Sequence, residues 1–113
     1  MIAGRRFAGA IVAMAIALPA AVTPARAADS VAGARKAQAC VACHGADGLS
    51  TQPNAPHLAG QPAFYVAEQL RQFRSGKRAS EVMSVIAKPL SDADIDDLAA
   101  WYEAIRIEAR PPS

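Results

Sequence analysis

The stretch of this sequence that decides the fold is Cys40-Val41-Ala42-Cys43-His44. On a helical turn, residues i, i+3 and i+4 share one face, so both thiols and the imidazole can point at one flat group. The pattern C-x-x-C-H is the attachment sequence of c-type haem. The thiols form thioethers with the haem vinyl groups, and the imidazole reaches the iron. The sequence therefore predicts one covalent haem c, attached at Cys40 and Cys43, with His44 as an axial iron ligand.

Three other uses of the two cysteines compete with haem attachment. A disulfide would close a very short loop and stabilise the chain little. A thioredoxin-type redox pair needs a βαβ context, and no strand is predicted before Cys40. A zinc site needs a second Cys/His pair at suitable spacing, which the sequence does not offer. Haem attachment is therefore the favoured interpretation.

Residues 1–27 have the features of an export signal. Arg5 and Arg6 supply the positive charge, Phe7–Leu18 is apolar, and Ala25-Arg26-Ala27 places small residues where a signal peptidase cleaves. We expect cleavage between Ala27 and Ala28 and a periplasmic location. The alternative is an uncleaved membrane anchor, but prolines and a threonine interrupt the apolar stretch, and its alanines are only weakly hydrophobic.

Composition and charge exclude several classes of protein. The chain has 113 residues, with 12 basic against 10 acidic, a net charge of +2. Removal of the leader, with its three arginines, leaves nine basic residues and a net charge of −1. The chain has no basic stripe with interleaved aromatics, so we predict no nucleic-acid partner. Residues 28–113 are predicted to form one small, monomeric domain, which needs extra stabilisation such as haem.

The hydrophobic periodicity predicts four helices and no strand, an all-α fold. The predicted helices cover Ser30–Cys43 with Asp29 or Ser30 as N-cap, Pro62–Gly76, Ser80–Ala87, and a last one from Ser91 to the prolines at 111 and 112. Ser91 and Asp94 form a capping arrangement. The residues expected to form the buried stripe of the last helix are Ile95, Leu98, Ala99, Tyr102 and Ile105.

Met83 is predicted to be the second axial ligand. Haem iron in electron carriers is commonly held by Met and His, and Met83 is the one methionine outside the leader. It lies far from His44 along the chain, so the chain can wrap around the haem. The alternative is a methionine that fills a gap in the core. The rival for the second ligand is His57, the other histidine, but it is expected at the surface of the proximal loop.

The ordered set of motifs resembles the class I cytochromes c. It is most similar to small bacterial periplasmic cytochromes with one haem, which correspond to one domain of the dihaem periplasmic kind. The resemblance extends over Gly33–Ile105. It rests on the segments 40–48, 56–61, 73–78 and 90–95, together with Tyr65, Leu70, Met83, Trp101 and Tyr102.

The resemblance implies a class I fold of about four helices wrapped around one covalent haem. It also implies that the carbonyl of Pro56 contacts the free ring nitrogen of His44 and that Leu58 packs on the proximal haem face. Gly33 would lie where the first and last helices cross, against Trp101 or Tyr102. The sequence departs from the family at Ala37, where an aromatic is common.

These features predict a periplasmic one-electron carrier, not an enzyme, that serves respiratory or dehydrogenase partners. The alternatives are a haem-bearing subunit of a larger redox complex and a haem sensor or enzyme with an open distal site. Arg71, Arg74 and Arg78 could dock a partner, as could the acidic start of the last helix, although both sets also suit the helix dipoles. The candidates for an apolar haem pocket are Leu58, Phe64, Leu70, Val82, Val85, Ile86, Leu90 and Leu98.

Overall fold

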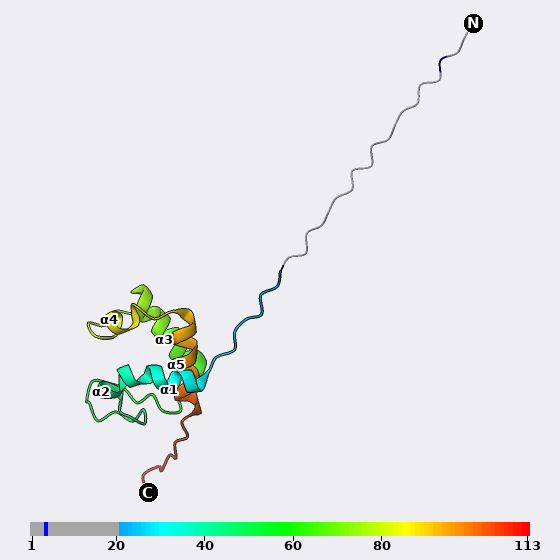
Figure 1. The fold of residues 1–113 in the computed structure, drawn as a ribbon. Coiled ribbons are helices and arrows are strands. Elements are labelled where there is room, and N and C mark those ends of the chain that lie inside the picture. Colours follow the sequence, from blue (N-terminus) through cyan, green and yellow to red (C-terminus); the bar gives the residue numbers. More distant parts are fainter. Residues whose placement is uncertain (1–3, 5–20) are drawn as a thin grey trace.

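The structure, a computed structural model, describes residue 4 and residues 21–113 (Figure 1). Its elements are α1 (Ser30–Lys36), the 3₁₀ helix η1 (Ala37–Cys40), α2 (Val41–His44), α3 (Ala63–Ser75), α4 (Met83–Ala87) and α5 (Asp92–Ala104). The described residues contain no strand, which confirms the all-α prediction. The predicted leader lies for the most part outside the described residues, and residues 21–29 form neither helix nor strand.

Helices α1, α3 and α5 pack together, and we call these three the helical frame (Figure 1). Gly33 of α1 touches α5 so closely that an added Cβ would overlap the backbone carbonyl of Asp97 and lie 2.8 Å from the Cβ of Trp101. Only a residue without a side chain permits this approach. Ala37 is buried in a cluster with Leu98 and Tyr102, against which Trp101 packs, so α5 supplies the aromatic rings of this contact.

The second cluster of the frame joins α3 to α5 through Val66, Ala67, Ile95 and Ala99. The expected stripe of α5 is confirmed at four of its five positions, and the fifth, Ile105, is half-buried. The predicted caps are also present. Ser91 and Asp94 form a reciprocal capping box, Asp29 is the N-cap of α1, and Gly76 ends α3 at φ 82°.

Three predicted helices differ from those in the structure. The first helix is not uniform, because η1 tightens the chain between α1 and α2. Helix α4 begins at Met83 rather than Ser80, since the Ser80 hydroxyl accepts the backbone N–H of Met83 at 3.1 Å. Helix α5 ends at Ala104, well before the prolines. Ile105 turns to extended backbone, which brings Ile107 toward Gly60.

A fully buried carboxylate, Asp97, joins α5 to the start of α1. It accepts the backbone N–H of Asp29 at 2.8 Å and pairs with Lys36 at 2.7 Å and with Arg26 at 2.9 Å. The hydrogen bonds from Arg26, Lys36 and Asp29 hold the pKa of Asp97 well below its usual range. The sequence analysis did not identify this group, because its partners are distant along the chain.

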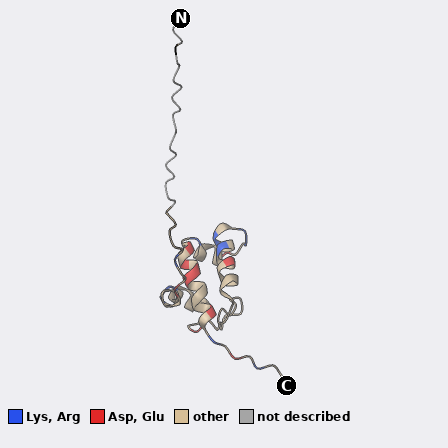
Figure 2. Ribbon diagram, turned by 90° about the vertical axis from the view of Figure 1, so that its right-hand side faces the viewer, with Lys and Arg blue, Asp and Glu red and all other residues tan. Residues whose placement is uncertain are grey.

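The arginines of α3 and the aspartates of α5 pair with each other across the frame. Arg71 binds Asp96 at 2.6 Å, and Arg74 binds Asp92 at 2.6 Å. Basic and acidic residues therefore lie on neighbouring helices (Figure 2). These two arginines and two aspartates neutralise one another, which weakens the suggestion that either set is a separate docking patch.

Candidate functional site

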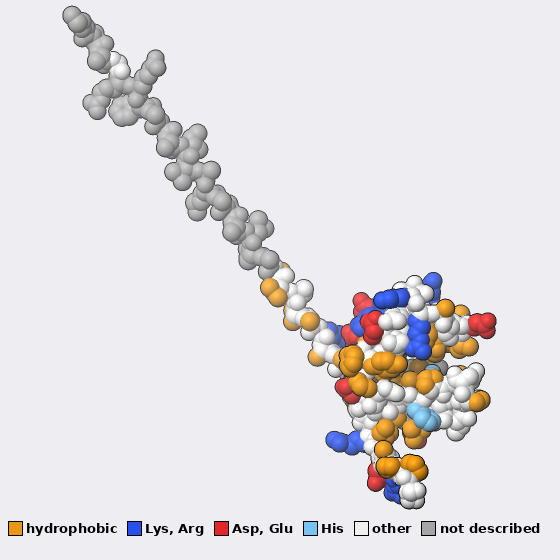
Figure 3. All heavy atoms as spheres, turned by 180° about the vertical axis from the view of Figure 1, so that it is seen from behind, with side chains coloured by type: hydrophobic (Ala, Val, Ile, Leu, Met, Phe, Trp, Pro, Cys, Tyr) orange, Lys and Arg blue, Asp and Glu red, His pale blue; other side chains and the backbone are white. Residues whose placement is uncertain are grey.

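A cavity of about 760 Å³ opens beside the helical frame. Its volume lies in the range of small-molecule and cofactor sites. Seen from behind, the molecule is hollowed there, with hydrophobic side chains and a histidine around the opening (Figure 3). The lining comes from η1, α2, the loop after α2, α3, α4 and α5. The cavity therefore collects residues that are distant in the sequence.

The two cysteines lie at the junction of η1 and α2. Cys40 is half-buried and lines the cavity, Cys43 is exposed, and the two thiols are not bonded to each other. Burial raises the pKa of the Cys40 thiol, although a hydrogen bond with Tyr102 partly opposes this shift. Both cysteines also line a small adjoining hollow with Met83. Their thiols are thus available at one edge of the site.

His44 ends α2 and is buried, with 6% of its surface exposed. Its Nδ1 atom lies 2.8 Å from the carbonyl oxygen of Pro56. A carbonyl oxygen only accepts, so Nδ1 carries the ring hydrogen and Nε2 keeps the lone pair that can bind a metal ion. This is the geometry that the resemblance implied for His44 and Pro56.

Local hydrogen bonds fix the loop that carries Pro56. The Gly48 carbonyl accepts the backbone N–H of Leu58 at 2.8 Å, and the Ser50 hydroxyl donates to the Cys43 carbonyl at 2.7 Å. His57 is exposed, as predicted, and its Nδ1 accepts the backbone N–H of Ser50 at 2.8 Å. The C-x-x-C-H motif gives no signal for this hydrogen bond of His57.

Met83 reaches the same cavity from α4. It is half-buried, and its backbone is fixed by the Ser80 hydroxyl. Ser80 in turn donates its backbone N–H to the Ser84 hydroxyl at 3.1 Å. The structure thus brings the His44 imidazole and the Met83 thioether to one cavity, from two separate helices. That these residues bind iron stays a prediction.

Most of the expected apolar pocket residues line this cavity. They are Leu58, Leu70, Val85, Ile86, Leu90 and Leu98. Val82 lines the adjoining hollow. The prediction for Phe64 is wrong, because its side chain is 79% exposed. Phe64 is outside the inward-facing stripe of α3, whose buried residues are Val66 and Ala67.

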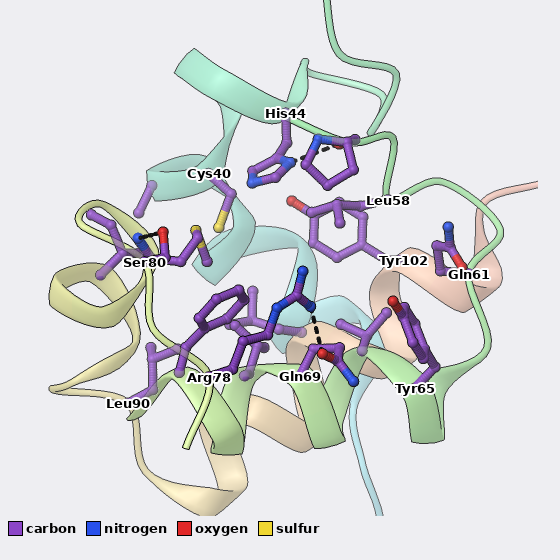
Figure 4. Close-up of a pocket in the computed structure, with 18 of the residues that line it drawn as sticks. Cys40, His44, Leu58, Gln61, Tyr65, Gln69, Arg78, Ser80, Leu90 and Tyr102 are labelled. Atoms are coloured by element: carbon purple, nitrogen blue, oxygen red, sulfur yellow. Dashed lines mark hydrogen bonds between the residues drawn. The ribbon is translucent and has the colours of Figure 1, made fainter. Parts of the chain in front are cut away.

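Sequence patterns did not predict the polar side chains that line one side of the cavity. Gln61, Tyr65, Gln69 and Arg78 line it. Figure 4 shows Cys40 across the cavity from Gln61 and Tyr65. The i, i+4 spacing of Tyr65 and Gln69 on α3 places both on one helix face, which is the signal that could have found them.

The match to known sequences agrees with this site. A family described as "Cytochrome C oxidase, cbb3-type, subunit III" matches residues 26–101, more than half of the chain. The chain belongs to this cytochrome c family. Haem c is therefore its cofactor, and Cys40 and Cys43 fit the attachment motif. The free thiols, the Nε2 atom of His44 and the largely apolar cavity fit this group.

Curated relatives of this cytochrome c include double-length and single-length proteins. Cytochrome c4 of Pseudomonas aeruginosa is 46% identical over 66% of this chain but only 37% of its own length. Cytochrome c-554(548) of Halomonas halodenitrificans is 42% identical over 67% of this chain and 95% of its own length. A protein of Thiomonas intermedia named "thiosulfate dehydrogenase electron acceptor" is 44% identical over 67% of this chain and 36% of its own length.

Solved cytochromes share the fold. Cytochrome c4 from Pseudomonas stutzeri superimposes with a TM-score of 0.67 at 38% identity, over 71% of this chain and 47% of that structure. A thiosulfate dehydrogenase from Marichromatium purpuratum superimposes with a TM-score of 0.65 at 35% identity, over 74% of this chain and 20% of that structure. The expected class I fold, similar to one domain of dihaem cytochromes, is confirmed. Among the helices of the described residues, none is long and apolar enough to cross a membrane.

Proposed function

We propose that this cytochrome c4-like protein is a periplasmic one-electron carrier. Cys40 and Cys43 would hold the haem covalently, and His44 and Met83 would supply the two protein ligands of its iron. The observation that carries the proposal is the shared, largely apolar cavity to which α2 brings the imidazole and α4 brings the thioether. When bound there, haem supplies a one-electron iron couple.

The protein's own groups orient the ligands and exclude water. The Pro56 carbonyl fixes the His44 ring and its tautomer. Leu58, Leu70 and Leu98 cover the cavity with apolar surface. An apolar site and a methionine ligand both favour ferrous iron and raise the reduction potential. With two protein ligands in place, no iron position is open to a substrate, so the protein is not an enzyme.

The N-terminal segment supports a periplasmic location. We infer that residues 1–27 direct export and that cleavage after Ala27 releases the cytochrome domain. Arg26 would then leave with the leader, while Lys36 and the Asp29 backbone remain as partners of Asp97.

The redox partner is proposed from the names of two matched proteins. The Thiomonas relative is named as the electron acceptor of a thiosulfate dehydrogenase, and one superimposed structure is a thiosulfate dehydrogenase. We propose a periplasmic dehydrogenase as electron donor. The alternative, a permanent subunit of such an enzyme, predicts that the tagged protein purifies with its partner through high-salt washes. A free carrier elutes alone.

Carbon monoxide binding tests the axial pair. The reduced wild-type protein should keep its spectrum under carbon monoxide at neutral pH, because Met83 fills the position opposite His44. Met83→Ala should bind the gas and lose the weak far-red sulfur-to-iron band of the oxidised state. Glu81→Gln, at an exposed position two residues before Met83, is the matched control. Rapid carbon monoxide binding by the wild type would favour the sensor or enzyme alternative.

A further inference from the structure

Arg26 belongs to the segment that cleavage would remove, yet it binds a carboxylate of the folded domain. Its Nη1 and Nη2 atoms donate to the two oxygens of Asp97 at 2.9 and 3.0 Å. The Asp97 side chain is completely buried, whereas that of Arg26 is 54% exposed. Cleavage after Ala27 therefore takes a cation away from a carboxylate that stays inside the helical frame.

The hydrogen bonds of Asp97 show what that loss leaves open. Four are formed: two from Arg26, one from the backbone N–H of Asp29 at 2.8 Å and one from Lys36 Nζ at 2.7 Å. An ionised carboxylate has about four acceptor positions, so all of them are used. Without Arg26, each oxygen keeps one partner and loses one. A buried charge that loses a partner is strongly destabilising, so this site favours a replacement donor.

The charges around Asp97 favour a cation as that donor. The hydrogen bond and the charge of Asp97 raise the pKa of the Arg26 guanidinium. Asp29 and Asp94 act in the same direction, so three carboxylates face this place. Lys36 faces it as well, but it already pairs with Asp94 at 2.8 Å in addition to Asp97. A new positive charge beside Asp97 would restore the charge that Arg26 supplied.

Cleavage itself creates such a charge. Hydrolysis of the Ala27–Ala28 peptide bond by water leaves a carboxylate on Ala27 and an ammonium with three N–H donors on Ala28. Both residues are exposed, so the bond is accessible to a peptidase. The Asp29 nitrogen lies 2.8 Å from Asp97 Oδ1, and the Ala28 nitrogen is one residue further, at most about 3.6 Å along the chain. Rotation about the Ala28 Cα–C bond turns the ammonium towards the carboxylate.

We propose that Asp97 is the binding site for the α-ammonium group of Ala28, which takes the place of Arg26 in the mature protein. The inference rests on the cleavage site proposed above. The ammonium joins the start of α1 to α5, the two helices that are already in contact at Gly33. The last arginine of the leader thus stabilises the precursor, and the new N-terminus stabilises the processed domain.

An insertion tests the position of this charge. Two glycines placed between Ala27 and Ala28 keep the small residues of the cleavage signal and move the ammonium two residues away from Asp97. The mature holoprotein should then have a lower urea midpoint, because Asp97 loses a charged partner. The same insertion in Asp97→Asn should cause no further loss. Ala28→Ser, which leaves the ammonium in place, is the matched control and should keep the wild-type midpoint.

The α-amino group provides a second, more local readout. Labelling with an amine reagent at a series of pH values measures its pKa in the holoprotein. The three carboxylates that face this place outweigh Lys36, so in the wild type this pKa should lie above the range usual for a chain terminus. The insertion should return the pKa to that range. This readout does not depend on the stability of Asp97→Asn.

Equal losses from the insertion in both backgrounds, or an α-amino group with an ordinary pKa in the wild type, would overturn the inference while haem attachment stands. N-terminal sequencing identifies the first residue directly. A mature chain that begins at a residue other than Ala28 would overturn the proposed cleavage site and this inference with it. The absorption spectrum measures haem separately, so failure of the proposed electron carrier is distinguishable from failure of this inference.

Discussion

The helical frame and the α4 wall of the cavity differ in how completely they bury their side chains. In the frame, Ile95 and Asp97 are fully buried, and the carboxylate is paired. In the α4 wall, by which we mean residues 82–86, Val82 is 57% exposed, Val85 69% and Ile86 43%. Contiguous exposed apolar residues usually mark a surface that something covers.

This difference in burial indicates which half of the molecule depends on the cofactor. Within the described residues, no buried side-chain polar atom lacks a hydrogen-bond partner, so the frame leaves no such atom for the cofactor to satisfy. The α4 wall has a five-residue helix, too short to be stable alone. Haem would complete the core on that side. A ligand that binds only the folded state stabilises that state, so loss of haem should loosen α4 first.

The largest expected effect follows removal of both thiols. Cys40→Ala combined with Cys43→Ala should abolish covalent haem and release α4, while the frame retains helix content. Haem staining after denaturing electrophoresis measures attachment, and hydrogen exchange measures the order of α4. Ala42→Ser keeps the motif and is the control. Haem that stays with the double variant through denaturation would contradict the assigned attachment.

A methyl group added at the α1–α5 contact should destabilise the helical frame. Gly33→Ala adds a Cβ that overlaps the Asp97 carbonyl, so the helices must separate. Overpacking of this kind lowers the free energy of unfolding by roughly 3 kcal/mol. Val31→Ile, which enlarges an exposed side chain of α1, should change it by less than about 0.5 kcal/mol. Urea denaturation measures both, and equal stability of the two variants would contradict the close contact.

Acid should weaken the frame through Asp94 and Asp97. Hydrogen bonds from Lys36 and Ser91 lower the pKa of Asp94 to about 2, and the pKa of Asp97 is lowered as well. Depressed carboxylate pKa values stabilise the fold above the unfolded pKa of about 4, and this stability is lost as pH falls through the folded values. The free energy of unfolding should therefore fall below about pH 4.

Asp97→Asn separates this effect from acid release of the haem ligands. The variant should be less stable at pH 7 and should lose part of the pH dependence below pH 4. Glu81→Gln, at an exposed position of the α4 side, should keep the wild-type profile. Denaturation curves at several pH values provide the measurement. If Asp97→Asn kept the wild-type dependence of unfolding free energy on pH, Asp97 would not contribute to the acid sensitivity.

The smallest effect concerns the helix caps of the frame. Ser91→Ala removes the side chain that accepts the Asp94 backbone N–H at 3.0 Å, and loss of such a cap costs about 1 kcal/mol. Ser30→Ala should cost less than about 0.5 kcal/mol, because Asp29 caps α1. Thermal unfolding of both variants tests this, and a larger loss in Ser30→Ala would be inconsistent with the caps described.

Sequence patterns predicted the features that depend on neighbours along the chain. The capping box at Ser91, the stripe of α5 and the clustering of Cys40 and His44 all follow from spacings of three or four residues. The buried Asp97 could not be predicted, because Lys36 and Asp29 reach it from the other end of the chain. The same holds for the early end of α5, which depends on the packing of Ile107 near Gly60.

In the candidate site, too, some features follow from local spacing and others depend on tertiary packing. The motif identified the residues expected to hold haem, and helical periodicity placed most of the apolar lining. The exposed side chain of Phe64 depends on how α3 lies against its neighbours, and the place of Arg78 at the cavity depends on the turn that follows α3. Charge pattern alone grouped Arg78 with Arg71 and Arg74, whereas packing separates them.

The most direct test of the central claim is the intact mass and the oxidised absorption spectrum of the exported protein, purified from a host that matures c-type cytochromes. We expect a mass equal to residues 28–113 plus one haem, with the far-red sulfur-to-iron band present at neutral pH. A colourless protein of apoprotein mass, with both Cys40 and Cys43 open to alkylation, would contradict it.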